Sequence, residues 1–341
     1  MIGNYLASPR HNRNIWHALS EHLEEVGWNV IHTSTKEHQF LRLLDMIYTV
    51  IRERKRYSLA QIDVFSGKAF IFAEICVCLL RLLNKPVVLT LHGGRLPEFA
   101  QKYPRRVSHL LQRAQVVVTP SPFLQIGLRQ YRNEIRFIPN PIDISASVFR
   151  QRSQPVPNLV WVRAFHEIYN PSLAIQVLNI LITEFPEVNL TMIGPKKSNG
   201  SLDHVQVLAT NLQVVDRVKV IPGVANSEIP RLLDQNDIFI NTSNYDTAPR
   251  SIIEAMANGL CIVSTNVGGL PWMVEDQVEA LLVPPNDPEA MANAIRRVLT
   301  EPDLAARLSA SARHRAQDLD WSVILPKWET LFTEVIKSSN V

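Results

Sequence analysis

The sequence is poor in cysteine, with Cys76, Cys78 and Cys261 as its three thiols among 341 residues. The count is odd, and the spacing does not match a metal-binding motif. All three lie in apolar stretches, where buried thiols are common. This pattern points away from an oxidising environment, in which disulfides form, and indicates a reducing compartment.

Long apolar runs are also missing. The first residues, MIGNYLASPRHNRN, lack the apolar core of a signal peptide. The most apolar segment, residues 70–83, is too short to span a membrane and contains Glu74 and Arg81, so we interpret it as a buried helix. We therefore expect a cytoplasmic protein. MIGNYL is short for a central strand, and we expect the true start of the chain to lie upstream.

Strong charge and metal-ligand patterns are absent. The formal net charge is +3 and the isoelectric point is near 8.8, which is too mild to indicate nucleic acid but suits an anionic small substrate. No Asp-x-Asp motif ends a predicted strand, and the ten histidines do not cluster with ligand spacing. We therefore expect no metal and no other cofactor.

One segment is both basic and amphipathic. Residues 40–57, FLRLLDMIYTVIRERKRY, combine apolar positions at helical spacing with a run of cations. Two interpretations stay open: a solvated helix face, or peripheral contact with acidic lipid on the inner face of the cell membrane.

Strand and helix patterns alternate along the whole chain, as they do in parallel α/β folds. The polar, proline-bearing stretch at residues 149–158 indicates a linker. We therefore predict an α/β protein of two Rossmann-like doubly wound domains, residues 1–148 and 158–320, with the ligand in the cleft between them. WNVIHTST, residues 28–35, is expected to be a strand, and residues 321–341 a final amphipathic helix.

The stretch DTAPRSIIE places Asp246 and Glu254 on either side of a helix start. Because proline is tolerated only in the first helical turn, we expect the helix to start at residues 247–249 and to stop at Gly259. Its first amides form an anion site between the two acids. A ligand with both hydroxyl groups and phosphate would use this arrangement. For Asp246 and Glu254 by themselves, a helix-start charge and a solvated helix residue are the alternative interpretation.

The region from residue 241 to residue 299, NTSNYDTAPRSIIEAMANGLCIVSTNVGGLPWMVEDQVEALLVPPNDPEAMANAIRRVL, closely resembles the signature of glycosyltransferase family 4. Its acid and glutamate are separated by seven positions, and a Gly-Gly-Leu-Pro stretch precedes a proline-rich loop. The resemblance continues through VLTLHGG, VVVTPSPFL, RFIPNPID, LVWVRAFHEIYNP and NLTMIGP. It covers most of the chain in the family's order.

The resemblance implies a GT-B fold and retaining transfer of a sugar from a nucleotide sugar bound mainly by the C-terminal domain. Glu254 would hold the ribose hydroxyls, and Asp246 would face the transferred sugar. The amides near Arg250 and Ser251 would cap the diphosphate. The final helix would return to the N-terminal domain, as the family's crossover helix does.

Two further residues match the family's catalytic positions. Arg163 in LVWVRAF would neutralise the leaving diphosphate, since a guanidinium can bind two oxygens at once. His92 in LHGGR would lie near the sugar and the acceptor, with glycines that let a ligand approach closely. The remaining donor-binding candidates are Pro249, Lys196, Gly223 and Gly94.

The sequence also departs from the family's pattern. Asp246 stands where a glutamate is usual, so its loop must lie closer to the ligand or a water must bridge the gap. Ile168 stands where the family has a lysine, and Lys196, Lys197 or Arg250 would have to supply that charge. The first strand–helix loop has Ser8 and Pro9 in place of the usual glycines.

The sequence thus predicts a metal-independent, retaining, hexosyltransferase-like enzyme with a UDP- or GDP-linked donor. Its acceptor would be a carbohydrate or lipid-linked hydroxyl in polysaccharide, glycolipid or glycoconjugate synthesis. Two alternatives stay open. A non-hydrolysing nucleotide-sugar 2-epimerase shares the architecture, and a non-catalytic nucleotide-sugar-binding subunit would explain the missing lysine and the shortened acid.

Overall fold

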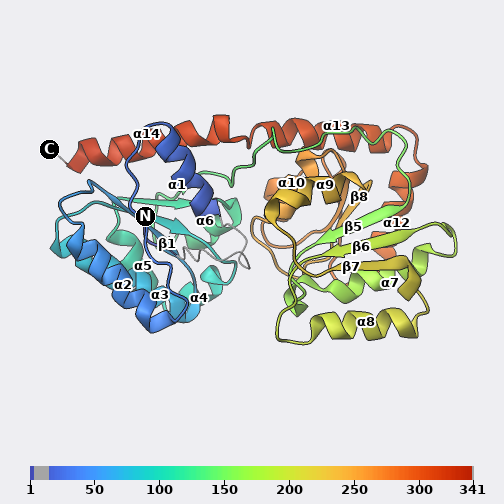
Figure 1. The fold of residues 1–341 in the computed structure, drawn as a ribbon, viewed down its shortest axis with the longest axis horizontal. Helices are drawn as coiled ribbons and strands as arrows, with labels where there is room; N and C mark the ends of the chain where they lie inside the picture. Colours follow the sequence, from blue (N-terminus) through green and yellow to red (C-terminus); the bar gives the residue numbers. More distant parts are fainter. Residues whose placement is uncertain (4–14, 340–341) are drawn as a thin grey trace. The chain divides into compact units, whose positions relative to one another are not determined.

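The computed structural model describes residues 1–3 and 15–339 (Figure 1). The chain divides into two compact units. One consists of Met1–Pro141 together with Trp321–Val341, and the other of Ile142–Asp320. The final helix, α14 (Trp321–Ser339), is therefore part of the same unit as the N-terminal half of the chain.

The first unit contains a parallel sheet in the order β1-β2-β3-β4. These strands are Ala60–Val64, Val87–Leu91, Val116–Thr119 and Arg136–Phe137. Every residue of β2 is buried, because helices cover both faces of the sheet. Ile2 pairs in parallel with both Thr33 and Ile62, on the side of β1 away from β2.

Two groups of helices cover this sheet. One core contains buried residues from α2, α3, α4, α5 and α6, and the other joins α1 and α14 to the opposite face. Helices α1 and α14 contact each other directly (Figure 1). The helices are α1 (Ile15–Glu25), α2 (Gln39–Arg52), α3 (Phe70–Leu82), α4 (Leu96–Lys102), α5 (Pro104–Gln112) and α6 (Pro122–Leu128).

The strand expected at residues 28–35 is not formed. Among the described residues this stretch has a single bridge position, Thr33, whose N–H donates to the carbonyl of Met1. The described segment beside this stretch is residues 1–3, whose hydrogen bonds reach Ile31, Thr33 and Ser34. Ser8 and Pro9 lie outside the described residues.

The second unit contains a parallel sheet in the order β10-β9-β8-β5-β6-β7. The chain builds outward from β5 to β7 and then returns to place β8 on the other side of β5. The boundary between β5 and β8 is therefore the topological switch point of the sheet, where open α/β sheets bind ligands. The strands are β5 (Asn158–Val162), β6 (Asn189–Ile193), β7 (Val218–Ile221), β8 (Ile238–Asn241), β9 (Cys261–Thr265) and β10 (Leu281–Val283).

Helices cover both faces of this sheet as well. One core contains residues of α7, α8 and α12, and the other contains residues of α9, α10 and α11. Helix α13 contributes to both cores. The helices are α7 (Pro171–Leu181), α8 (Ser201–Asn211), α9 (Ile229–Asp234), α10 (Arg250–Ala257), α11 (Leu270–Met273), α12 (Pro288–Thr300) and α13 (Leu304–Gln317).

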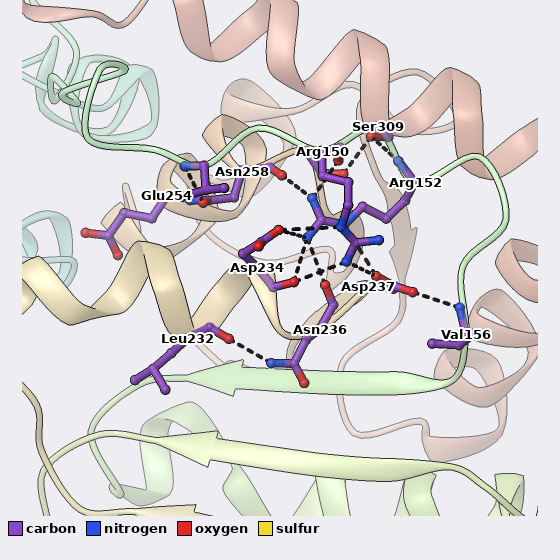
Figure 2. A network of polar contacts seen from close by, with 12 residues as sticks. Arg150, Arg152, Val156, Leu232, Asp234, Asn236, Asp237, Glu254, Asn258 and Ser309 are labelled. Carbon is purple, nitrogen blue, oxygen red and sulfur yellow. Dashed lines mark hydrogen bonds and ion pairs between the residues drawn. The ribbon is translucent and has the colours of Figure 1, made fainter.

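The stretch expected to be a linker belongs to the second unit, and the chain passes between the units at Pro141–Ile142. Figure 2 shows the polar contacts that hold Arg150, Arg152 and Val156 of this stretch. Arg152 is fully buried, and its Nη1 donates to the carbonyl of Asn258. Its Nη2 donates to the carbonyl of Asn236 at 3.0 Å, and Arg150 pairs with Asp237 at 2.6 Å. A buried cation needs such partners, and they lie too far along the chain for a local pattern to reveal them.

Helix α3 contains two of the three cysteines, Cys76 and Cys78. Cys76 is buried but Cys78 is exposed, because residues two positions apart on a helix point to nearly opposite sides.

Among the described residues, none of the helices has the length and apolar character needed to cross a bilayer.

Candidate functional site

The switch point of the second unit brings together Arg163 and Asp246. Arg163 directly follows β5, and Asp246 lies in the loop after β8. Nη2 of Arg163 donates to Oδ2 of Asp246, and the two side chains are 18% and 11% exposed. The guanidinium carbon of Arg163 also lies 4.8 Å from the centre of the Tyr169 ring, a cation–π contact.

A second acid–base pair lies on helix α10. Nε of Arg250 is 2.9 Å from Oε1 of Glu254, one helical turn later, and Glu254 is 13% exposed. Burial raises the pKa of the Glu254 carboxyl group, while the charges of Arg250 and Arg163 act in the opposite direction. Because the charge of Arg163 acts to lower the pKa of Glu254, the two ion pairs interact electrostatically. We call Arg163, Asp246, Arg250 and Glu254 the switch-point cluster.

Helix α10 begins at Arg250, one residue later than expected, with Pro249 as its N-cap. Nε of Arg163 and Oγ of Ser251 are buried and make no hydrogen bond to any described residue. Ser251 is 6% exposed. Buried polar groups in folded proteins nearly always have partners, and the first turn of a helix favours anions. The arrangement can therefore bind an anionic group between Arg163 and the start of α10.

Two glycines that the sequence reasoning did not assign to this site set the positions of Arg163 and Asp246. A Cβ atom on Gly194 would overlap the carbonyl oxygen of Arg163, and one on Gly268 would overlap that of Asp246. Both glycines have positive φ angles, +154° and +53°. Two sequence signals marked these positions: the Gly-Pro pair that begins GPKK, which contains Gly194, and the Gly-Gly pair that ends NVGG, which contains Gly268. Only a residue without a side chain lets these loops approach the cluster so closely.

Gly268→Ala should therefore lower the free energy of unfolding by about 2–4 kcal/mol, because the methyl group must displace the backbone of Asp246. Gly200→Ala is the matched control. Gly200 also has a positive φ, +75°, but no atom lies within 4 Å of the position that its added methyl group would take, so about 1 kcal/mol is expected. Chemical denaturation of both variants measures the difference. Equal losses of unfolding free energy in the two variants would show that the loop containing Asp246 moves aside at no further cost in stability.

The three other predicted donor-binding residues, Lys196, Gly223 and Gly94, are spread over both units. The ammonium of Lys196 donates to Asp203 at 2.7 Å, although its backbone pairs with Phe165. Gly223 follows β7, which β6 separates from β5. Gly94 lies in the turn after β2, in the first unit. Their predicted roles stay predictions.

Ile168 stands where the family has a lysine, and its backbone is hydrogen-bonded to the loop that contains Asp246. The N–H of Ile168 donates to Nδ1 of His166, and its carbonyl accepts from the N–H of Asn244. The loop after β5 thus holds the loop after β8, which contains Asp246. Of the cations named in the sequence analysis as substitutes, Arg250 is the one that the structure places in the cluster.

In the first unit, His92 follows β2 and its ring contacts Trp16 and Phe65, with ring centres 4.7 and 5.3 Å away. Its Nε2 is buried and lies 3.5 Å from Oδ1 of Asp63, a β1 residue whose side chain is 2% exposed. Gln61 donates to the same oxygen at 2.8 Å. The sequence reasoning missed Asp63, although a carboxylate inside the apolar strand AQIDV was a signal. A carboxylate there can orient the His92 ring.

Two family descriptions match this chain, one in each half. Residues 4–146 match "Glycosyltransferase Family 4", and residues 150–315 match "Glycosyl transferases group 1". Together they cover most of both units, without the final helix α14, and include the residues of the switch-point cluster.

Curated relatives resemble about half of the chain. The D-inositol 3-phosphate glycosyltransferase of Corynebacterium glutamicum is 26% identical over 174 residues, which is 50% of this chain and 42% of the relative. That of Salinispora arenicola is 30% identical over 198 residues, 54% of this chain and 44% of the relative. The chain thus matches less than half the length of these relatives.

Solved structures share the fold over most of the chain. Sucrose-phosphate synthase from Thermosynechococcus elongatus has a TM-score of 0.82 at 20% identity, covering 99% of this chain and 98% of that one. Anabaena HepE, solved with UDP and glucose, has a TM-score of 0.75 at 22% identity, covering 93% and 89%. Both parallel α/β units of this chain therefore have the GT-B architecture that the sequence predicted.

Proposed function

We propose, on the premise that this chain belongs to glycosyltransferase family 4, that it transfers a sugar from a nucleotide sugar to a hydroxyl acceptor with retention of configuration. The curated relatives named above are glycosyltransferases, and HepE is a fold neighbour solved with UDP and glucose. The acceptor class is a carbohydrate or lipid-linked hydroxyl of a cell-surface polysaccharide, glycolipid or glycoconjugate.

The observation that carries this proposal is the switch-point cluster beside the start of α10. Its two carboxylates can accept hydrogen bonds from vicinal hydroxyls, and its two guanidinium groups can bind phosphate oxygens. The buried Oγ of Ser251 offers a further donor. A nucleotide sugar combines the hydroxyl groups and the diphosphate that such a site would satisfy.

In the proposed mechanism the bond between the sugar C1 and the diphosphate oxygen breaks as the acceptor oxygen attacks from the same face. The acceptor proton passes to the departing diphosphate oxygen. Arg163 and the amides at the start of α10 stabilise the charge that develops there. Glu254 holds the ribose, and Asp246 faces the transferred sugar. The family resemblance assigns His92 a further catalytic role. Arginine and helix amides offset the diphosphate charge, so the proposed reaction is independent of a metal ion.

A thermal-shift panel of UDP-, GDP- and ADP-sugars, followed by transfer assays with the stabilising donor, tests the proposal. Stabilisation by one nucleotide and formation of a product with retained configuration are expected. Conversion of the donor to its 2-epimer without an acceptor would favour the epimerase instead. Binding without transfer to any hydroxyl acceptor would favour the non-catalytic subunit.

Glu254→Gln should weaken binding of the free nucleoside diphosphate by about 1.5–3 kcal/mol, because an amide accepts hydrogen bonds from ribose less well than a carboxylate. Isothermal titration calorimetry measures the loss. Glu301→Gln is the control, since Glu301 is an exposed acid that also pairs with an arginine, Arg297. Unchanged affinity in Glu254→Gln would remove Glu254 from the ribose site.

The raised pKa of Glu254 adds a pH dependence. Nucleotide affinity should fall as the pH drops through that raised pKa, because protonation removes an acceptor that the ribose uses. Between the ordinary glutamate pKa, about 4.3, and the raised value, the folded state binds the proton more tightly than the unfolded state. The free energy of unfolding should therefore decrease as the pH rises through this window. Glu254→Gln should abolish both effects.

A further inference from the structure

Helix α2 exposes a row of large apolar side chains. Met46 and Val50 are buried in the core of the first unit, so the helix already has a packed face. Its outward side nevertheless carries five large side chains that are 41% to 61% exposed: Phe40, Leu41, Leu44, Tyr48 and Ile51. Their spacing places them along one side of the helix. A solvated helix face would instead be polar, so the structure disfavours that interpretation of residues 40–57.

The apolar surface continues onto helix α3, which packs against α2. A shallow groove between the start of α2 and the start of α3 is lined by four apolar residues, Phe40, Leu43, Ile71 and Phe72, and by four polar ones, Glu37, His38, Gln39 and Lys68. Ile71 is 47% exposed. We call Phe40, Leu41, Leu44, Tyr48, Ile51 and Ile71 the α2–α3 stripe. Contiguous exposed apolar surface of this kind marks an interaction site rather than scattered surface residues.

Cations border this stripe. Residues 36–56 contain six Lys and Arg residues and three acids, so this short segment has a net charge equal to that of the whole chain, +3. Among its acids, Glu53 is 13% exposed and is already paired with Arg52 and Arg56. The exposed cations around the stripe are Lys36, Arg52, Arg54, Lys55, Arg56 and Lys68.

We propose that the α2–α3 stripe and its bordering cations bind an anionic lipid surface, with α2 lying in the plane of the membrane. The apolar side chains would enter the boundary between headgroups and acyl chains, while the long basic side chains reach the lipid phosphates. Tyr48 fits this depth because its ring is apolar and its hydroxyl group polar. The positive border selects an anionic surface, since anionic lipids attract Lys and Arg close to the membrane.

Sedimentation of the full chain with lipid vesicles tests this proposal. Binding to vesicles containing about 30 mol% phosphatidylglycerol should be at least about tenfold stronger than to pure phosphatidylcholine, and it should weaken as salt is added. Equal binding to both vesicle types, or no binding to either, would overturn the proposal.

Matched variants separate the stripe from a general surface effect. The double variant Phe40→Ser/Leu44→Ser should lose binding by about tenfold or more. Ile126→Ser, which removes an apolar side chain of similar exposure (59%) on α6, should retain it. Lys55→Gln/Arg54→Gln should weaken binding about tenfold, whereas Arg105→Gln/Arg129→Gln should not. Thermal unfolding checks that each variant is folded.

The competing explanation is that the stripe binds a second copy of this chain. If light scattering without lipid shows a dimer that Phe40→Ser/Leu44→Ser dissociates, the stripe is an interface between copies of the chain and the lipid proposal fails. A monomer whose vesicle binding depends on the stripe and on its cations supports it.

Discussion

Replacing Arg163 with alanine should lower kcat by about 100- to 1000-fold, the effect of removing one donor aimed at developing negative charge. The value of kcat/KM should fall with it, while the affinity for free nucleoside diphosphate changes much less. The physical reason is that Arg163 follows β5 at the switch point, with its Nε buried and without a hydrogen-bond partner among the described residues. Donor turnover and calorimetric binding measure the two effects separately.

Two variants calibrate this result. Arg163→Lys retains the positive charge but loses the planar fork, so its kcat should lie between those of the wild type and Arg163→Ala. Arg297→Ala removes an exposed arginine that pairs with Glu301 in the same unit, and turnover should stay unchanged. If Arg163→Ala turns over the donor as fast as Arg297→Ala, the arginine does not act on the leaving diphosphate.

Replacing Asp246 with alanine should lower kcat by about 100-fold and leave the affinity for sugar-free nucleoside diphosphate nearly intact. The ion pair adds a second consequence. Without Asp246, the 18% exposed guanidinium of Arg163 loses its carboxylate, so the free energy of unfolding should decrease by about 1–3 kcal/mol. Steady-state kinetics and chemical denaturation measure the two effects.

The double variant Asp246→Ala/Arg163→Ala shows whether the two residues act together. If Asp246 works mainly by orienting Arg163, the losses in kcat should not add, because the second substitution removes what the first has already disabled. If Asp246 also holds the sugar, the double variant should be slower than either single one. Asp246→Glu, which introduces the family's usual residue, should retain more turnover than alanine. An Asp246→Ala enzyme that is destabilised but fully active would show that the acid serves only the fold.

Much of the fold was predictable because its signals are local. The apolar run at residues 87–91 is the buried strand β2, the periodic run at residues 70–83 contains α3, and Gly259 follows the end of α10 with a φ angle of +73°. Where pairing depends on distant partners, prediction was less accurate. Residues 28–35 have a strand-like pattern but form no strand, and in the described part of the chain their partners include the short segment 1–3. Residues 149–158 look like a linker, yet the buried Arg152 ties them to carbonyls about a hundred positions away.

The sequence by itself determined the alternation of strands and helices, the parallel α/β class, the resemblance to family 4 and the identities of Arg163, Asp246 and Glu254 as candidates. These features depend on residues that are close in the sequence, through periodicity, turn chemistry and motif spacing. Tertiary structure alone decided that Arg163 pairs with Asp246, that Asp63 lies behind His92, and that the outward side of α2 is apolar. Those facts depend on which strands become neighbours and which faces become covered. A local pattern in the chain does not determine such long-range packing.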